Sequence, residues 1–239
     1  MKKIFTISIF TFLFSFALIA QENKIVWDYP IKPGTDEWEK CNSPNEIYQK
    51  LQIPENILKK IDTKSLVQIC LDYPAPTIFY LFNTPQQGFD GFYKQFNGIR
   101  ELMNRKDACH HLLNQYINMS MDNFSPLETL EEQGKFVERF YYLELFIVQP
   151  IILKSFSKEE RKDLMRESLN KFDMKFSRKD LFGGFNTTAT IWLMISMLHA
   201  ENIWTIDATN SSKISIETGR LIDFDVTSIY QQVKSYCHE

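Results

Sequence analysis

The sequence predicts an all-α protein, either a multi-helix bundle or an irregular α-α superhelix of helical pairs, with a small C-terminal β-hairpin or meander. Its 239 residues include only 8 Gly and 9 Pro, well below the roughly 12% of average usage, which disfavours a turn-rich β-sandwich. Apolar residues make up 44% of the chain and aromatic residues 14%, as expected of a folded globular protein. Apolar side chains also recur at helical spacing along most of the chain.

The first twenty residues have the layout of a secretory signal peptide. Lys2 and Lys3 precede an apolar run at residues 4–19, and Ala20 offers a small residue for cleavage. This run is shorter than the ~20 residues that a membrane-spanning helix needs, although a retained anchor is the alternative. We therefore expect residues 1–20 to be removed, which leaves a secreted or periplasmic bacterial protein with no membrane span.

The mature chain, residues 21–239, is expected to form a single helical domain, with a possible subdivision near residues 177–186. Removal of the leader takes away two lysines and no acidic residue, so the net charge changes from −3 to −5. Such a chain lacks the basic excess that is typical of nucleic-acid-binding proteins, and we expect no nucleic acid partner.

Four cysteines remain in the mature chain: Cys41, Cys70, Cys109 and Cys237. Their spacing fits neither a zinc ribbon nor a CxxC redox pair. Cys70 and Cys109 lie among apolar residues and are interpreted as small buried side chains. A disulfide from Cys41 or Cys237, with its pairing open, is the alternative in an oxidising compartment. Cys41 also lies too far from the leader to carry the lipid of a lipoprotein.

Short helices are predicted in the first part of the chain. Residues 36–40 and 44–51 each form one, and Ser43 caps the second. A helix capped by Thr63 is predicted to end before Pro74. Another short helix is predicted by isoleucines at four-residue spacing, namely Ile53, Ile57 and Ile61.

The clearest helical pattern consists of five apolar residues separated by 3, 4, 3 and 4 positions: Phe89, Phe92, Phe96, Ile99 and Met103. This spacing predicts one helix with all five side chains on a single face. Three glycines in or near this helix are expected to allow close approach of a neighbouring segment: Gly88, Gly91 and Gly98. A further helix is predicted to begin at Asp107.

The second half is predicted to contain longer helices. One begins at Ser125–Pro126, carries two apolar stripes and ends or kinks at Pro150, and the next follows a capping box of Ser157 and Glu160. Gly183–Gly184 is predicted to break the chain before a central buried helix at residues 191–198. Short alternation within residues 204–224 predicts the β elements, and a last helix covers residues 226–236.

Metal and catalytic patterns in the sequence are weak. Asp107 and His111 lie four positions apart, but further metal ligands are missing nearby, and we expect no metal and no cofactor. Cys109–His110 and Cys237–His238 are sequence neighbours, which point about 100° apart on a helix and do not form a nucleophile–base pair. A hydrolase with a site assembled from distant residues around His199 or His110, with His199 as a buried base, is the alternative.

Two further segments are candidates for ligand contacts. The stretch from Gly183 to Thr188 joins a glycine turn to a helix start, but it lacks the lysine and spacing of a phosphate loop. We expect an ordinary capped loop there, with Asn186 as a possible ligand contact. Asp223 and Asp225 fall on one side of a predicted strand and are interpreted as turn residues.

Short segments of the first half carry a family resemblance: Cys70-Leu71-Asp72-Tyr73-Pro74, Phe96-Asn97-Gly98, Glu101-Leu102 and Arg105-Lys106-Asp107. They resemble a family of uncharacterised secreted bacterial proteins with a similar helical region after a signal peptide. The resemblance covers mainly residues 54–117 and extends toward Gly184 and Trp192. Some members continue into a cysteine-hydrolase-like domain marked by an Asn-Cys-His segment, which this sequence lacks, so the resemblance supplies no catalytic residue.

The function expected from the sequence is that of an exported helical module which binds a protein, peptide or glycan-linked partner. The expected contacts are three aromatic side chains, Trp38, Tyr80 and Trp204, together with the side chain of Asn186. The alternatives are the hydrolase described above and a purely structural envelope protein.

Overall fold

The computed structural model describes residues 27–75, 79, 81–124, 129–205, 214–221 and 225–238, without the side chains of Phe185 and Ile214. Several predicted features lie outside the described residues: the leader, Tyr80, the helix start at Ser125–Pro126, Asp223 and most of the predicted hairpin or meander.

Helices dominate the described residues, and this confirms the all-α class. In chain order the elements are α1 (Asp36–Glu39), α2 (Pro44–Lys50), α3 (Glu55–Leu58), α4 (Thr63–Leu71), α5 (Pro85–Gln95), α6 (Asn97–Asn104), α7 (Ala108–Asn118), a 3₁₀ turn (Met121–Asn123), α8 (Leu130–Ile147), α9 (Pro150–Leu153), α10 (Lys158–Ser177), α11 (Lys179–Ala200), β1 (Ile214–Ser215), β2 (Arg220–Leu221) and α12 (Val226–His238). The two strands pair antiparallel, with Ile214 opposite Leu221. The rest of the predicted hairpin or meander falls on residues 206–213 and 222–224, outside the described ranges.

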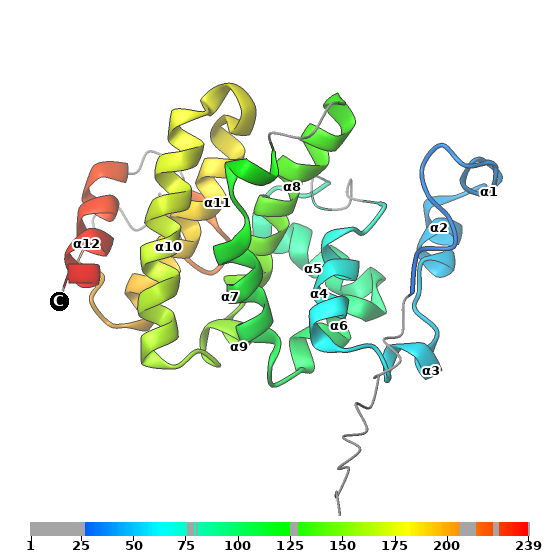
Figure 1. The fold of residues 1–239 in the computed structure, drawn as a ribbon, viewed down its shortest axis with the longest axis horizontal. Coiled ribbons are helices and arrows are strands. Elements are labelled where there is room, and N and C mark those ends of the chain that lie inside the picture. Colours follow the sequence, from blue (N-terminus) through cyan, green and yellow to red (C-terminus); the bar gives the residue numbers. More distant parts are fainter. Residues whose placement is uncertain are drawn as a thin grey trace, which may run out of the picture.

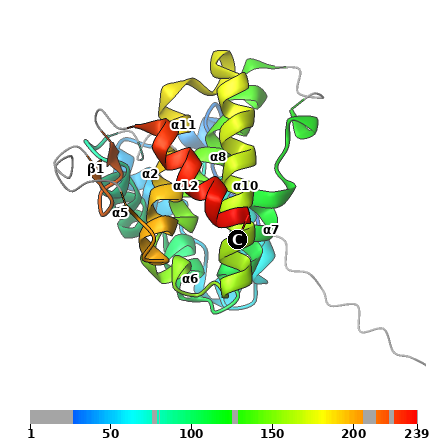
Figure 2. The ribbon, with the colours of Figure 1, turned by 90° about the vertical axis from the view of Figure 1, so that its left-hand side faces the viewer.

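Helix α8 runs through the middle of the molecule. It packs against α4, α5, α7, α9 and α11. In Figure 1, α12 lies at one end of the molecule and α1–α3 at the opposite end. Figure 2 shows α12 crossing in front of α10 and α11, both of which it contacts. The predicted subdivision at residues 177–186 covers the end of α10 and the start of α11 with its kink at Gly183, and this subdivision stays a prediction.

The predicted caps of α2 and α10 are confirmed, but α4 is capped by Asp62 and not by Thr63, which is the first residue of that helix. The Ser43 hydroxyl accepts a hydrogen bond from the Glu46 N–H, and the capping box of Ser157 and Glu160 is confirmed at the start of α10. Helix α8 begins at a capping box made by Thr129 and Glu132, where Thr129 has extended backbone angles (φ −99°, ψ 150°), so the predicted helix does not run continuously from Ser125–Pro126 into α8.

The prediction of one helix across Phe89 to Met103 is wrong, because Phe96 has extended backbone angles (φ −122°, ψ 123°) that separate α5 from α6. The Asn97 side chain explains the break: its Oδ1 accepts from the Ile53 N–H at 3.0 Å, and its Nδ2 donates to the Ile53 carbonyl at 2.7 Å. The two helices still bury all five apolar side chains. The predicted close approach of a neighbour is confirmed at Gly88, where a Cβ would lie 2.6 Å from the Phe79 carbonyl oxygen.

The β1–β2 turn is anchored on the helical core. The indole Nε1 of Trp192 on α11 donates to the Ile216 carbonyl at 2.6 Å, and the Gln86 N–H of α5 donates to the Thr218 carbonyl at 3.2 Å. Gly219 has a positive φ of 68°, and a Cβ there would lie 2.6 Å from the Trp192 ring. Glycine is therefore required at this turn for backbone conformation and for space.

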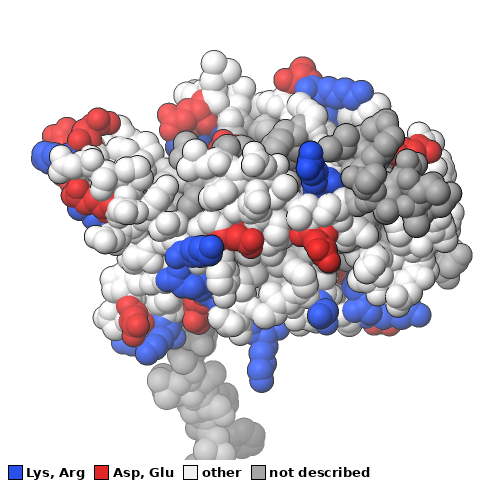
Figure 3. Space-filling view, turned by 180° about the vertical axis from the view of Figure 1, so that it is seen from behind, with Lys and Arg blue, Asp and Glu red and all other residues white. Residues whose placement is uncertain are grey.

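One face of the surface carries mixed charge (Figure 3), and the described helices are not of the membrane-spanning kind. On the face seen in Figure 3, basic and acidic side chains are scattered and interleaved. Among the helices that the structure describes, none has the length and apolar character needed to cross a membrane.

All four cysteines are free thiols, and the predicted burial of Cys70 and Cys109 is confirmed.

We predict that Gly219→Ala destabilises the protein more than Gly34→Ala. Both glycines have a positive φ, but a Cβ at Gly34 meets nothing within 4 Å, so that variant carries only the backbone strain. We expect a loss of roughly 1–3 kcal/mol for Gly219→Ala in urea unfolding, with a changed Trp192 fluorescence. Equal losses in the two variants would contradict the contact between Gly219 and Trp192.

Candidate functional site

A pocket of about 610 Å³ lies between α10, α11 and α12. Its lining residues come from the C-terminal half of α10, the kinked start of α11 and the first turns of α12: Phe172, Asp173, Phe176, Lys179, Gly183, Gly184, Thr187, Thr188, Ile191, Val226, Thr227 and Tyr230. This volume lies within the range of pockets that bind small molecules or side chains of a partner.

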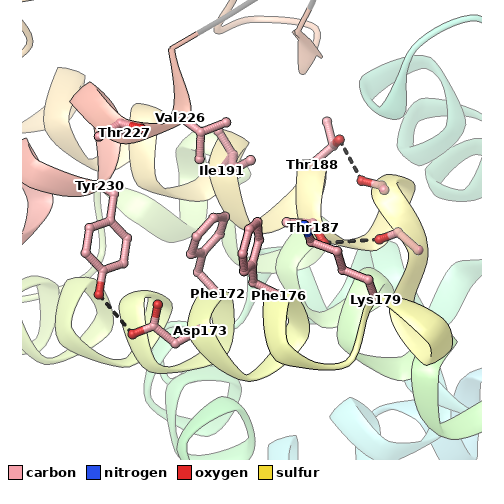
Figure 4. A pocket seen from close by; sticks show the side chains of 12 residues that line it. Phe172, Asp173, Phe176, Lys179, Thr187, Thr188, Ile191, Val226, Thr227 and Tyr230 are labelled. Atoms are coloured by element: carbon pink, nitrogen blue, oxygen red, sulfur yellow. Dashed lines mark hydrogen bonds between the residues drawn. The ribbon is translucent and has the colours of Figure 1, made fainter.

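The walls of the pocket are mainly apolar and aromatic. Phe172 and Phe176 stack with ring centroids 5.7 Å apart, and Tyr230 approaches Phe172 at the same centroid distance. Figure 4 shows the two phenylalanines side by side, with Ile191 and Val226 above them. Phe176 is 51% exposed, so the pocket opens to solvent along α10. Apolar surface left open in this way favours the binding of an apolar group.

Polar groups surround the mouth of the pocket. The Tyr230 hydroxyl donates to Asp173 at 2.9 Å and joins α12 to α10, and this hydrogen bond raises the pKa of Tyr230. The Lys179 ammonium lies 3.5 Å from the centroid of the Phe176 ring, a cation–π contact. These groups supply one carboxylate and one cation to the rim without interrupting the apolar walls.

The start of α11 is shaped by its two glycines. Gly183 has φ 60° and ψ 178°, which interrupts the helix, so the predicted break is present as a kink rather than a loop. After the kink, the Thr187 hydroxyl donates to the Gly183 carbonyl at 3.1 Å and the Thr188 hydroxyl donates to the Gly184 carbonyl at 2.8 Å. These bonds satisfy carbonyl groups at the kink and place both threonines on the pocket (Figure 4).

A network of buried polar groups lies behind the pocket, centred on Glu144 of α8. The Glu144 side chain is fully buried. Its Oε1 accepts from the Tyr116 hydroxyl of α7 and the Thr190 hydroxyl of α11, each at 2.8 Å. Its Oε2 accepts from the Lys175 ammonium of α10 at 2.8 Å. Three helices thus donate to one carboxylate on a fourth helix.

Lys175 is equally buried and uses its ammonium on three acceptors. Besides Glu144, it donates to the Thr190 hydroxyl at 3.0 Å and to the Asn186 carbonyl at 3.4 Å. Burial lowers the pKa of Lys175, and the neighbouring Glu144 carboxylate opposes that shift. Burial also raises the pKa of Tyr116 well above its ordinary value, so the phenol stays a donor. The network is therefore an ion pair in which each charge has polar partners.

The predicted ligand contacts fall in different places. Asn186 is buried inside α11, where its Nδ2 donates to the Val137 carbonyl at 2.7 Å, so it does not line the pocket. Its Oδ1 has no hydrogen-bond partner among the described residues. Trp38 and Trp204 are half-buried against the core and lie outside this pocket. Tyr80 is outside the described residues.

The histidines lie apart from the pocket. His199 is exposed at the end of α11, so the hypothesis of a buried base is wrong. His110 is exposed on α7 and contacts the Glu160 carboxylate through Nδ1. The Nε2 atom of His111 lies 3.5 Å from the Asp107 Oδ2 atom. Within the described part of the chain, no three His, Cys, Asp or Glu side chains are grouped as metal ligands.

A second pocket, of about 690 Å³, lies between residues 28–35, the end of α4 and α8. Its lysines and its arginine already have partners: Lys32 pairs with Asp28 and Lys135 with Glu131, each at 2.5 Å, while Arg139 pairs with Asp72. Because these cations are satisfied within the protein, the apolar pocket between α10 and α12 is the stronger candidate site.

Neither the buried network nor the aromatic wall of the pocket was predicted from the sequence. A signal for the network was present, because Glu144 interrupts an otherwise apolar run from Tyr141 to Val148. Lys171 and Lys175 likewise lie at i, i+4 beside the apolar stripe of α10, where a surface position is the usual expectation.

We predict that Lys175→Met lowers the free energy of unfolding by about 3–5 kcal/mol, because it leaves the Glu144 charge buried without a cation. The double variant Glu144→Gln/Lys175→Met should recover most of that loss, since the amide oxygen still accepts from Tyr116 and Thr190 and no buried charge remains. Urea unfolding of both variants checks this. A double variant as unstable as the single one would contradict the account.

Comparisons with known proteins find no match for the chain. No family model matches it, and neither the curated proteins nor the solved structures contain a match. The family resemblance of residues 54–117 therefore gains no support from these comparisons, and the functional argument for this protein depends on the geometry of its own site.

Proposed function

We propose that the protein is an exported helical binding module, whose pocket between α10, α11 and α12 receives an apolar or aromatic side chain of a protein or peptide partner. The observation that carries the proposal is the open aromatic wall, with Phe176 about half exposed over a pocket of about 610 Å³. Buried aromatic anchors in pockets of this kind supply most of the affinity in many protein interfaces.

The polar rim supports a peptide rather than a purely hydrocarbon ligand. Asp173 and Lys179 lie at the mouth and are exposed, so each can pair with a charge or a backbone group of the partner. A peptide offers such groups beside every side chain, whereas an aliphatic chain does not. A glycan-linked partner would need more polar groups inside the pocket.

Export belongs to the proposal through the leader of residues 1–20. Cleavage after Ala20 would release the mature chain into a periplasm or outside the cell. The hydrolase alternative gains no support from this pocket, because its lining contains neither His110 nor His199. A structural envelope protein, the other alternative, would not need an open apolar pocket.

We also propose that the helices form a bundle around α8 rather than a superhelix. Helix α8 packs against α4, α5, α7, α9 and α11. In a superhelical array each repeat contacts mainly its sequence neighbours, and no single helix has so many partners.

The experiment is selection of a random peptide library on the mature protein, residues 21–239, followed by affinity measurement on variants. We expect the enriched peptides to carry an apolar or aromatic anchor. Phe176→Asp places a charge on the wall, and we predict that it weakens these peptides at least roughly tenfold in a fluorescence titration.

The matched control is Ile151→Asp on α9, because Ile151 is 50% exposed and Phe176 is 51% exposed. This variant should keep the wild-type affinity. Enriched peptides that bind both variants equally well, or a library that yields no anchored peptide, would contradict the proposed function.

A further inference from the structure

Helices α10 and α11 each present two adjacent faces with different chemistry. On α10, Phe172 and Phe176 line the pocket while Lys175 points into the buried network. On α11, Thr187 and Ile191 line the pocket while Thr190 bonds to the network. The pocket and the network therefore lie on neighbouring faces of the same two helices, and movement of either helix changes both.

The kink at Gly183 alone does not fix the direction of the second part of α11 relative to the first part. A Cβ at Gly183 or Gly184 would meet nothing within 4 Å, and the side-chain bonds to their carbonyls come from Thr187 and Thr188 of α11 itself, so these contacts do not tie the kink to another helix. Glycine itself tolerates many backbone conformations. Contacts beyond the kink must fix how residues 186–191 approach α10.

The buried network supplies those contacts at two successive turns. Lys175 bonds to the Asn186 carbonyl and to the Thr190 hydroxyl, and the Asn186 side chain bonds to Val137 of α8. An ammonium has three N–H donors, and here they match three acceptors on α8 and α11. A neutral side chain of similar length cannot make these three bonds.

We infer that Lys175 is a positioning residue for the pocket: its ammonium fixes residues 186–191 of α11 against α10 and so sets the separation of the pocket walls. The expected effect on ligand binding rests on the proposed function. The expected effect on the conformation of α11 does not.

Lys171 provides a matched control on the same helix. It is also buried and pairs with a carboxylate, that of Glu167, and its ammonium lies 5.6 Å from the centroid of the Tyr116 ring. Glu167 is on α10 itself, so this pair does not connect α10 to α11. Glu167→Gln/Lys171→Met removes a similar ion pair without touching the wall of the pocket.

The experiment compares that control with Glu144→Gln/Lys175→Met in two measurements. The first is binding of the neutral apolar dye N-phenyl-1-naphthylamine, and the second is hydrogen exchange of the amides of residues 186–191. We expect the Lys175 variant to raise the Kd of the dye roughly fivefold or more, and to speed exchange of these amides about tenfold, although its unfolding free energy stays near the wild-type value. The Lys171 variant should change neither measurement.

The inference would be overturned if Glu144→Gln/Lys175→Met kept the wild-type Kd for the dye and the wild-type exchange rates. Equal changes in this variant and in Glu167→Gln/Lys171→Met would overturn it too. If Glu144→Gln/Lys175→Met does not fold, Thr190→Val replaces it, because it removes the hydroxyl bonds to Lys175 and to Glu144 and leaves the Lys175–Glu144 ion pair in place. The same signs of change are then expected, and their absence again overturns the inference.

The two proposals fail in different ways. Dye that does not bind the wild type, or that binds Phe176→Asp unchanged, contradicts the proposed pocket function, while hydrogen exchange still decides the role of Lys175. Unchanged exchange together with dye binding that Phe176→Asp weakens contradicts the inference alone.

Discussion

The buried carboxylate of Glu144 imposes the strictest physical condition on this fold. A charge at zero exposure is tolerated only when a counterion and hydrogen-bond donors surround it, and these arrive from Tyr116, Lys175 and Thr190. Each donor sits on a different helix, α7, α10 and α11. The condition therefore fixes how these three helices sit around α8, beyond what apolar packing alone requires, because apolar contacts tolerate small rotations and hydrogen bonds to a buried charge do not.

Helix content and most helix starts were predictable, because they depend on local chemistry. The Ser157–Glu160 capping box and the proline at the start of α2 are examples in which residues within one turn decide the outcome. The break at Phe96 was not predictable from spacing, since the residues on both sides keep a helical pattern. It arises from Asn97, whose side chain bonds to Ile53, 44 positions earlier in the chain.

The candidate site was predictable only in part. The glycines of the Gly183–Thr188 stretch pointed to the right segment, and Gly183, Gly184, Thr187 and Thr188 do line the pocket. Asn186, the predicted ligand contact in this stretch, lies away from the pocket, because successive residues of a helix point about 100° apart and its amide bonds to Val137 of α8. The aromatic wall needs α12 beside α10, and no local pattern brings Tyr230 next to Phe172.

An apolar pocket that stays open in water needs something to hold its walls apart. Each Å² of apolar surface left exposed forgoes about 25 cal/mol of burial, so the half-exposed Phe176 would gain if the pocket closed over it. Any closure that rotates α10 against α11 would draw Lys175 away from the Asn186 carbonyl and from Thr190. Breaking hydrogen bonds to a buried ammonium costs more than a small apolar contact returns. The buried ion pair of Lys175 and Glu144 therefore keeps the walls of the pocket apart.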